Sequence, residues 1–254
     1  MTSFPLTLAV VSGKGGVGKS VLAVNLAEAL VTAGLRVALL DADLGQSACP
    51  VLLNESPAVT LADVARGRAE LAETFHPTAG GVTLIQGART PEEVEAPVFS
   101  TLDAVLPLLQ ASHEVVLIDA PAGAEGPVRW ALDRADAGLL VLVGEPTAVA
   151  DAYALTKLIW AARPSFPLGA VVNFSDTEAE AEEVAERFAD VTERFLGQAP
   201  AYLGWVPYAA TIRRSVQRQT PVVREKGLAR HAFDTLATTT ALGPTAWTPQ
   251  PATL

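Results

Sequence analysis

Glycines, two lysines and a serine are spaced over residues 13–20 as Gly-Lys-Gly-Gly-Val-Gly-Lys-Ser. This stretch fits the pattern G-x-x-x-x-G-K-[ST] of a phosphate-binding loop. Glycine lets successive backbone N–H groups converge on phosphate oxygens, because it adopts positive φ and has no Cβ in the way. Lys19 is expected to reach the β- and γ-phosphates of a nucleotide, and the Ser20 hydroxyl to bind Mg²⁺. The predicted nucleotide contacts in this loop are Gly13, Gly15, Gly16, Val17, Gly18, Lys19 and Ser20.

The segments on either side of the loop are those that phosphate binding needs. Residues 6–11 form an apolar, β-branched run typical of a buried strand, and residues 19–33 are rich in alanine and leucine, as in a helix. A helix that begins directly after the loop adds its unpaired N–H groups and the positive end of its dipole to the site. The alternative is a glycine-rich turn without a ligand, but the complete pattern in this context favours a nucleotide-binding loop.

Aspartates close two further strands. Residues 36–41 predict a second buried strand, and strand, helix and strand in succession imply a parallel sheet. Residues 114–119 (Glu-Val-Val-Leu-Ile-Asp) match the Walker B pattern, whose acid holds Mg²⁺ through its water shell. Ligands bind at the carboxyl ends of such strands, so Asp41, Asp43 and Asp119 are expected to face the phosphates. The alternative is that these aspartates have no ligand and only cap the segment that follows each strand.

The string Lys-Gly-Gly-Val-Gly-Lys-Ser resembles the deviant Walker A loop of the MinD/ParA family of P-loop ATPases, particularly that of MinD and the flagellar-number ATPase FlhG (FleN). The resemblance implies that Lys14 reaches across a dimer interface to the nucleotide of the other subunit, as an arginine finger does. It also implies that Asp43 positions or activates the attacking water and that Asp41 supports the metal shell. The catalytic set is then Lys14, Lys19 and Asp43, and the metal set is Ser20, Asp41 and Asp119.

Three later positions extend the resemblance. Gly123, in Asp-Ala-Pro-Ala-Gly, would donate its N–H to the γ-phosphate and so distinguish ATP from ADP. Asn173 closes a strand predicted for residues 168–173 and would hydrogen-bond the adenine, although an Asn in this place is also ordinary turn chemistry. Pro207 begins the loop that flanks adenine in the family. The expected cofactors are therefore ATP and Mg²⁺.

Composition limits the other functions open to the chain. The chain has 254 residues, half of them hydrophobic, which suits one large α/β domain. Its net charge of −10 means that the surface as a whole does not bind nucleic acid or an anionic membrane. The single cysteine, Cys49, permits no internal disulfide and no C-x-x-C site. No apolar stretch approaches the ~18 residues of a membrane helix, and the start lacks the basic region of a signal peptide. A cytoplasmic location is expected.

The fold class expected is α/β: a single doubly wound, mostly parallel sheet of seven or eight strands with helices on both faces. Residues 1–241 are assigned to one P-loop ATPase domain, and the Pro/Thr-rich residues 242–254 to a disordered tail. Residues 91–110 are expected to form one long helix capped by Thr90.

The region between residues 212 and 231 opposes the acidic character of the chain. It holds six basic side chains against Glu225 alone, a local charge of +5. ParA proteins bind DNA non-specifically through basic residues near the C-terminus, whereas the basic amphipathic membrane helix of MinD and FlhG has no counterpart after Phe233. The predicted DNA contacts are Arg213, Arg214, Arg218, Arg224 and Arg230. Ion pairs with acidic helices of the same chain, or an acidic protein partner, are the alternatives.

The resemblance implies an ATP-dependent dimerising switch with slow, Mg²⁺-dependent and partner-stimulated ATP hydrolysis, used for spatial positioning or partitioning. The partners expected are a second copy of the chain, an activating protein and non-specific DNA, the last implying association with the nucleoid; peripheral membrane binding is disfavoured. A cytosolic metabolic P-loop enzyme of the same superfamily, of the amidoligase or synthetase type, is the alternative. Such enzymes rarely carry a lysine at the place of Lys14.

Overall fold

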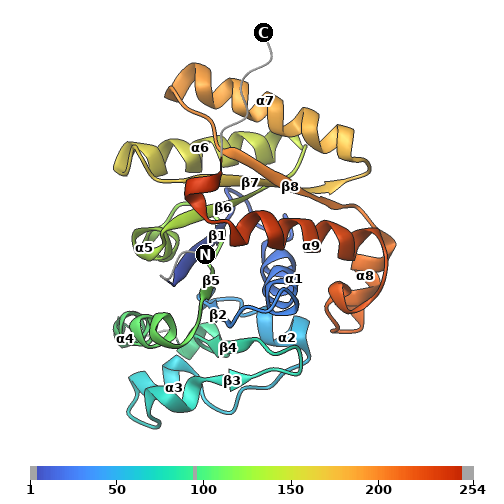
Figure 1. Cartoon of the computed structure of the whole chain (residues 1–254). Coiled ribbons are helices and arrows are strands. Elements are labelled where there is room, and N and C mark those ends of the chain that lie inside the picture. The colour runs from blue at the N-terminus through green and yellow to red at the C-terminus, as the bar shows by residue number, and fades with distance from the viewer. Residues whose placement is uncertain (1–4, 94–95, 248–254) are drawn as a thin grey trace.

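An eight-stranded sheet runs through the middle of the molecule (Figure 1) in a computed structural model that describes residues 5–93 and 96–247. The strand order is β3-β4-β2-β5-β1-β6-β7-β8, and every neighbouring pair is parallel except β3 with β4. The strands are β1 (Leu6–Val11), β2 (Val37–Asp41), β3 (His76–Pro77), β4 (Thr83–Gln86), β5 (Val115–Asp119), β6 (Ala137–Leu142), β7 (Leu168–Ser175) and β8 (Ala201–Pro207).

Helices cover both faces of this sheet, and each face has its own apolar core. One core includes α1 (Lys19–Thr32), α2 (Cys49–Leu53) and α9 (Leu228–Ala241) against strand residues such as Val10 and Leu39. The other takes Ala9 and Leu40 from the same strands, because successive side chains of a strand point to opposite faces. It is closed by α3 (Leu61–Ala65), α4 (Ala96–Ser112), α5 (Gly126–Arg134), α6 (Pro146–Ala162) and α7 (Glu178–Leu196).

The central strands are buried on both faces. All residues of β2, β5 and β6 are buried, which explains why these strands read as unbroken apolar runs rather than as an alternating pattern. The remaining elements are α8 (Ala210–Gln217) and the short 3₁₀ helices η1 (Leu71–Thr74), η2 (Pro91–Glu93), η3 (Val222–Arg224) and η4 (Pro244–Ala246). The predicted doubly wound, mostly parallel α/β fold is confirmed.

The helix expected over residues 91–110 differs from the structure. Residues 91–93 form η2, and α4 begins at Ala96, with residues 94–95 outside the described part of the chain.

The first six residues of the predicted disordered tail are folded. Residues 244–246 form η4, and Trp247 is 9 % exposed within the core that α1 and α9 share. The Trp247 indole N–H donates to the carbonyl of Thr239 at 3.3 Å. The large apolar area of a tryptophan explains why this segment packs onto the domain. The rest of the predicted tail, residues 248–254, lies outside the described residues.

Candidate nucleotide-binding site

In the loop between β1 and α1, two glycines leave no room for a side chain. A Cβ on Gly13 would lie 2.2 Å from the backbone carbon of Asp151 in α6, so α6 passes directly against the loop. Gly18 adopts φ +85°, and a Cβ there would lie 2.3 Å from the Asn173 amide nitrogen. The loop then opens α1 at Lys19, as a phosphate site at a helix N-terminus requires.

Lys19 lies at the base of this loop in contact with the acid of β5. Its ammonium donates to Asp119 Oδ1 at 3.0 Å, and the two residues are 7 % and 0 % exposed. The second oxygen of Asp119 accepts from the Cys49 thiol at 3.3 Å. Burial raises the pKa of that thiol well above its usual value, so the thiol keeps its proton and donates. The structure thus adds Cys49 to the predicted site.

Asp41 lies beside Asp119 because β2 and β5 pair in register at these two residues. Its Oδ2 accepts from the Ser47 hydroxyl at 2.8 Å and from the Cys49 N–H at 3.1 Å. Burial, together with the negative charge of Asp119, raises the pKa of Asp41 to about 7. The structure therefore confirms that the sheet brings these two strand-terminal acids together.

The two carboxylates of this site fit Mg²⁺. One ligand atom from each of Asp41, Cys49 and Asp119 lies within 4.8 Å of the others. Two buried carboxylates that repel one another are stabilised by a divalent cation, and Mg²⁺ prefers carboxylate, hydroxyl and water oxygens over a thiol. Ser20, the second residue of α1, is half-buried next to Lys19. Asp41 and Asp119 are therefore placed to hold the metal, whereas the metal contact of Ser20 stays a prediction.

Asp43 and Gly123 follow the carboxyl ends of β2 and β5. Asp43 is half-buried, and its Oδ1 accepts from the Gln46 N–H at 3.2 Å, so the side chain is held by the turn after β2. The Gly123 N–H donates to the carbonyl of Ser12 at 2.9 Å. Its predicted contact with a γ-phosphate requires this hydrogen bond to open, and the roles of both residues stay predictions.

Lys14 points away from the buried acids. Its ammonium lies 3.3 Å from Glu145 Oε2 and 3.4 Å from the Thr147 hydroxyl, where α6 begins. The side chains of Lys14 and Glu145 are 41 % and 69 % exposed. An ion pair this exposed contributes little to stability, so Lys14 can exchange Glu145 for another partner at small cost.

Asn173 holds the phosphate-binding loop in place. Its amide nitrogen donates to the Val17 carbonyl at 2.7 Å, and its Oδ1 accepts from the Phe174 N–H at 3.0 Å. Only 4 % of the residue is exposed. The predicted adenine contact of Asn173 stays a prediction, whereas its contact with the loop was missed because it joins residues 156 positions apart. Pro207 pairs with Ser175 at the end of β7, close to Asn173.

Several of the basic residues near the C-terminus are paired with acidic side chains, so fewer are free to bind DNA than their number indicated. Arg224 forms two hydrogen bonds with Glu28 of α1, at 2.9 and 2.5 Å, and Glu28 is 4 % exposed. Arg224 is therefore a structural residue rather than a free DNA contact.

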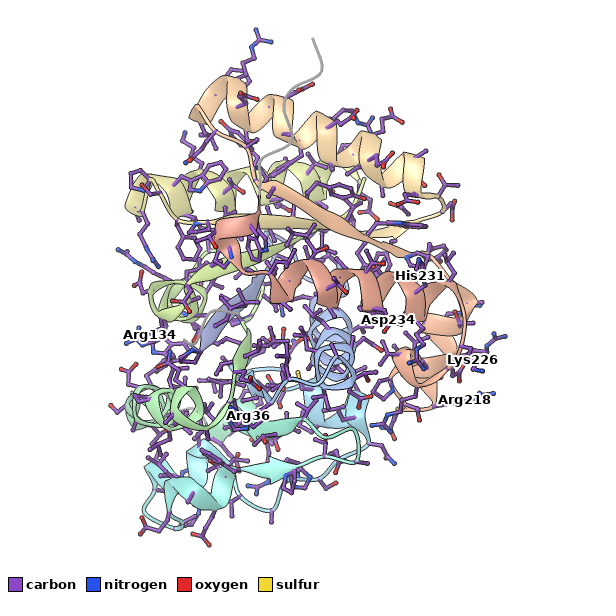
Figure 2. All side chains as sticks on the ribbon, in the orientation of Figure 1. Arg36, Arg134, Arg218, Lys226, His231 and Asp234 are labelled. Carbon is purple, nitrogen blue, oxygen red and sulfur yellow. The ribbon has the colours of Figure 1, made fainter. Side chains whose placement is uncertain are left out.

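Two further arginines of this region have acidic neighbours. Arg218 lies 3.7 Å from Glu225 and Arg230 lies 3.4 Å from Asp234; Figure 2 shows Arg218 at the outer edge of the molecule. Arg213 and Arg214 are exposed on α8 and form no ion pair with any residue that the structure describes.

A parallel sheet, a glycine loop opening a helix, a buried Lys–Asp pair and neighbouring acids define a P-loop nucleotide-binding protein. Residues 8–222 match the family model described as the CobQ/CobB/MinD/ParA nucleotide binding domain. The chain therefore belongs to this family, as the resemblance predicted. The description of the family names CobQ and CobB together with MinD and ParA.

Individual relatives narrow the comparison. The chain is 36 % identical over 218 residues to the "Antiactivator FleN" of Pseudomonas aeruginosa, covering 85 % of this chain and 78 % of that protein. It is also similar to the cell division ATPase MinD of Pyrococcus furiosus, with a TM-score of 0.78 and 28 % identity over 92 % of this chain and 98 % of the other. The MinD of Pyrococcus horikoshii, solved with Mg-ADP, has the same fold, with a TM-score of 0.79 and 24 % identity over 93 % of this chain and 96 % of that one.

A membrane-spanning segment was not expected, and in residues 5–93 and 96–247 no helix is both long and apolar enough to be one.

Proposed function

We propose that this chain is an ATP-dependent dimerising switch that hydrolyses ATP slowly with Mg²⁺. The observation that carries the proposal is the placement of the two loop lysines. Lys19 is buried against Asp119, where it serves its own nucleotide site, whereas Lys14 is exposed and faces away from that site. A cation placed in this way suits an approach to the phosphates held by a second copy of the chain.

The site residues then have separate tasks. Mg²⁺ would neutralise negative charge on the β- and γ-phosphates. Lys19 and the N–H groups of the loop bind the phosphates, while Ser20, Asp41 and Asp119 hold the metal. Asp43, two residues after the end of β2, orients the attacking water. With ATP bound, the Gly123 N–H would donate to the γ-phosphate instead of to the Ser12 carbonyl. ADP has no γ-phosphate, so only ATP would change the conformation of the surface near Lys14.

The test is the oligomeric state of a hydrolysis-deficient variant. Asp43→Ala should form dimers with ATP and Mg²⁺ in size-exclusion chromatography with light scattering, and remain monomeric with ADP. Adding Lys14→Ala to this variant should return the protein to monomers. The control is Lys157→Ala, which removes an exposed lysine of α6 and should leave the dimer intact. Monomers in every case would refute the switch and favour a metabolic enzyme of the amidoligase or synthetase type.

The role of the switch in the cell is proposed from its relatives. FleN is named an antiactivator, YlxH of Helicobacter pylori a flagellum site-determining protein, and MinD of Thermotoga maritima a septum site-determining protein. These names support a positioning or partitioning role for this chain. A cytoplasmic location and an activating protein partner are also part of the proposal, as the resemblance to the family implies. The test is the position of a fluorescent fusion in cells, which should become uniform in Lys14→Ala.

The dimer is also proposed to bind DNA without sequence preference. Of the five arginines that the sequence indicated, Arg213 and Arg214 would make most of the contacts. Two copies of the chain would present four such side chains. Each phosphate contact adds about 0.9 to the slope of log affinity against log salt, so the double Ala variant should lower that slope by ~2 or more. Filter binding with Asp43→Ala and ATP measures it, and sedimentation with anionic liposomes is the comparison. Retention by liposomes alone would refute DNA binding, and retention by neither would favour a protein partner.

A further inference from the structure

Cys49 connects the two buried acids of the candidate metal site. Its backbone N–H donates to Asp41 Oδ2 at 3.1 Å, and its thiol donates to Asp119 Oδ2 at 3.3 Å. All three residues are 0 % exposed, so water does not compete for these hydrogen bonds. One residue at the beginning of α2 therefore contacts the acids that end two neighbouring strands, β2 and β5.

The two acids depend on Cys49 to different degrees. Asp41 also accepts from the Ser47 hydroxyl at 2.8 Å. Asp119 accepts at one oxygen from Lys19 at 3.0 Å and at the other from the Cys49 thiol. The terminal torsion of an aspartate is soft, so hydrogen bonds determine how its carboxylate is turned. Without the thiol, Lys19 would be the one side-chain donor left to Asp119 among the residues that the structure describes.

Lys19 has a second task in the proposed function, because its ammonium binds the phosphates of the nucleotide. When the ammonium turns to the phosphates, its hydrogen bond with Asp119 weakens. Cys49 stays where it is, because it belongs to the apolar core that includes α1. The thiol is therefore the donor that still holds Asp119 when nucleotide and metal are bound.

We infer that Cys49 is a positioning residue for the metal site, whose thiol fixes the Asp119 carboxylate in the orientation that suits Mg²⁺. This inference rests on the proposed binding of nucleotide with Mg²⁺ and adds a residue that lies outside the phosphate loop and the Walker B strand. Outer hydrogen-bond partners of metal ligands change metal affinity by about 10- to 100-fold, and S–H is a weak donor, so about 10-fold is expected here. The alternative is that Cys49 only fills space, as a small apolar residue would.

Substitutions at Cys49 separate the hydrogen bond from the packing. Serine keeps a donor, whereas alanine and valine have none, and valine keeps most of the volume, so either of these two suffices if the other does not fold. ADP affinity is measured by calorimetry in saturating Mg²⁺ and in EDTA. The ratio of the two affinities reports how tightly the chain with ADP holds the metal, because binding of metal and nucleotide are linked.

The ratio should fall about 10-fold in Cys49→Ala and Cys49→Val and stay within about threefold of the intact chain in Cys49→Ser. The control Val51→Ala, which changes an exposed residue of α2, should leave the ratio unchanged. In an Asp119→Asn background, Cys49→Ala should lower the ratio by less than about twofold further, because the carboxylate that the thiol positions is already gone. ADP affinity in EDTA should be the same in all Cys49 variants.

An unchanged ratio in the variants without a donor would overturn the inference. A serine variant as weak as the alanine variant would also overturn it, and so would an equal loss of ADP affinity in Mg²⁺ and in EDTA, since both results indicate packing alone. If the intact chain binds ADP equally well with and without Mg²⁺, the metal site is refuted while nucleotide binding stands. If the intact chain does not bind ADP at all, the proposed function itself fails.

Discussion

Removal of Arg224 should destabilise the protein rather than abolish a DNA contact. The guanidinium makes two hydrogen bonds with Glu28, at 2.9 and 2.5 Å, and this pair ties η3 to α1. Glu28 is 4 % exposed, so Arg224→Ala leaves a buried carboxylate without its counter-ion. Breaking a buried pair costs about 3–5 kcal/mol, and because the Arg224 side chain is 34 % exposed, water can enter and the cost should be near 2–3 kcal/mol.

Urea unfolding followed by tryptophan fluorescence measures this free energy. Arg213→Ala, which removes an exposed arginine of α8, should change stability by less than about 0.5 kcal/mol. Adding Glu28→Gln to Arg224→Ala should restore about half of the loss, because the unpaired group is then neutral. A loss below 0.5 kcal/mol in Arg224→Ala, or no recovery with Glu28→Gln, would refute the assignment of a structural ion pair.

Three further predictions concern the site and the acid stability of the domain. Lys19→Ala should lose nucleotide binding in calorimetry, whereas Asp43→Ala should bind ATP and hydrolyse it at least ~10-fold more slowly in a phosphate-release assay; a wild-type rate would show that Asp43 does not orient the water. Gly13→Ala should cost about 1–3 kcal/mol in urea unfolding, because the new Cβ would lie 2.2 Å from the Asp151 backbone carbon; full stability would show that α6 moves freely. Burial raises the pKa of Asp63, but hydrogen bonds from Arg68, Thr60 and Arg89 lower it more, to well below its usual value. The folded pKa is depressed, so Asp63 stabilises the protein fully above the unfolded value of about 3.9 and less as the pH falls below it. The difference in unfolding free energy between wild type and Asp63→Asn should therefore shrink from pH 6 to pH 3, and a constant difference would contradict the assignment.

The sequence by itself determined the phosphate loop and the main features of the fold. The glycines, Lys19 and Ser20 are adjacent in the chain, between an apolar run and a helix, so their arrangement depends on local structure. Asp41 and Asp119 were also predicted at the metal site, Asp41 from its place at the end of a parallel strand and Asp119 from the Walker B pattern. Both inferences need only the order of strands and helices, which the periodicity of apolar residues reveals.

The tertiary structure decided which side chains pair. Arg224 and Glu28 are 196 residues apart, and the count of charges between residues 212 and 231 could not reveal a partner on α1. The hydrogen bond from the Asn173 amide to the Val17 carbonyl depends on how β7 and the phosphate-binding loop lie beside one another. Such contacts arise from strand register and helix packing over long separations, where neither spacing nor residue type indicates a partner. For that reason the sequence predicted the phosphate loop and its neighbouring acids, but not the hydrogen bond from Asn173 to the loop or the pairing of the arginines.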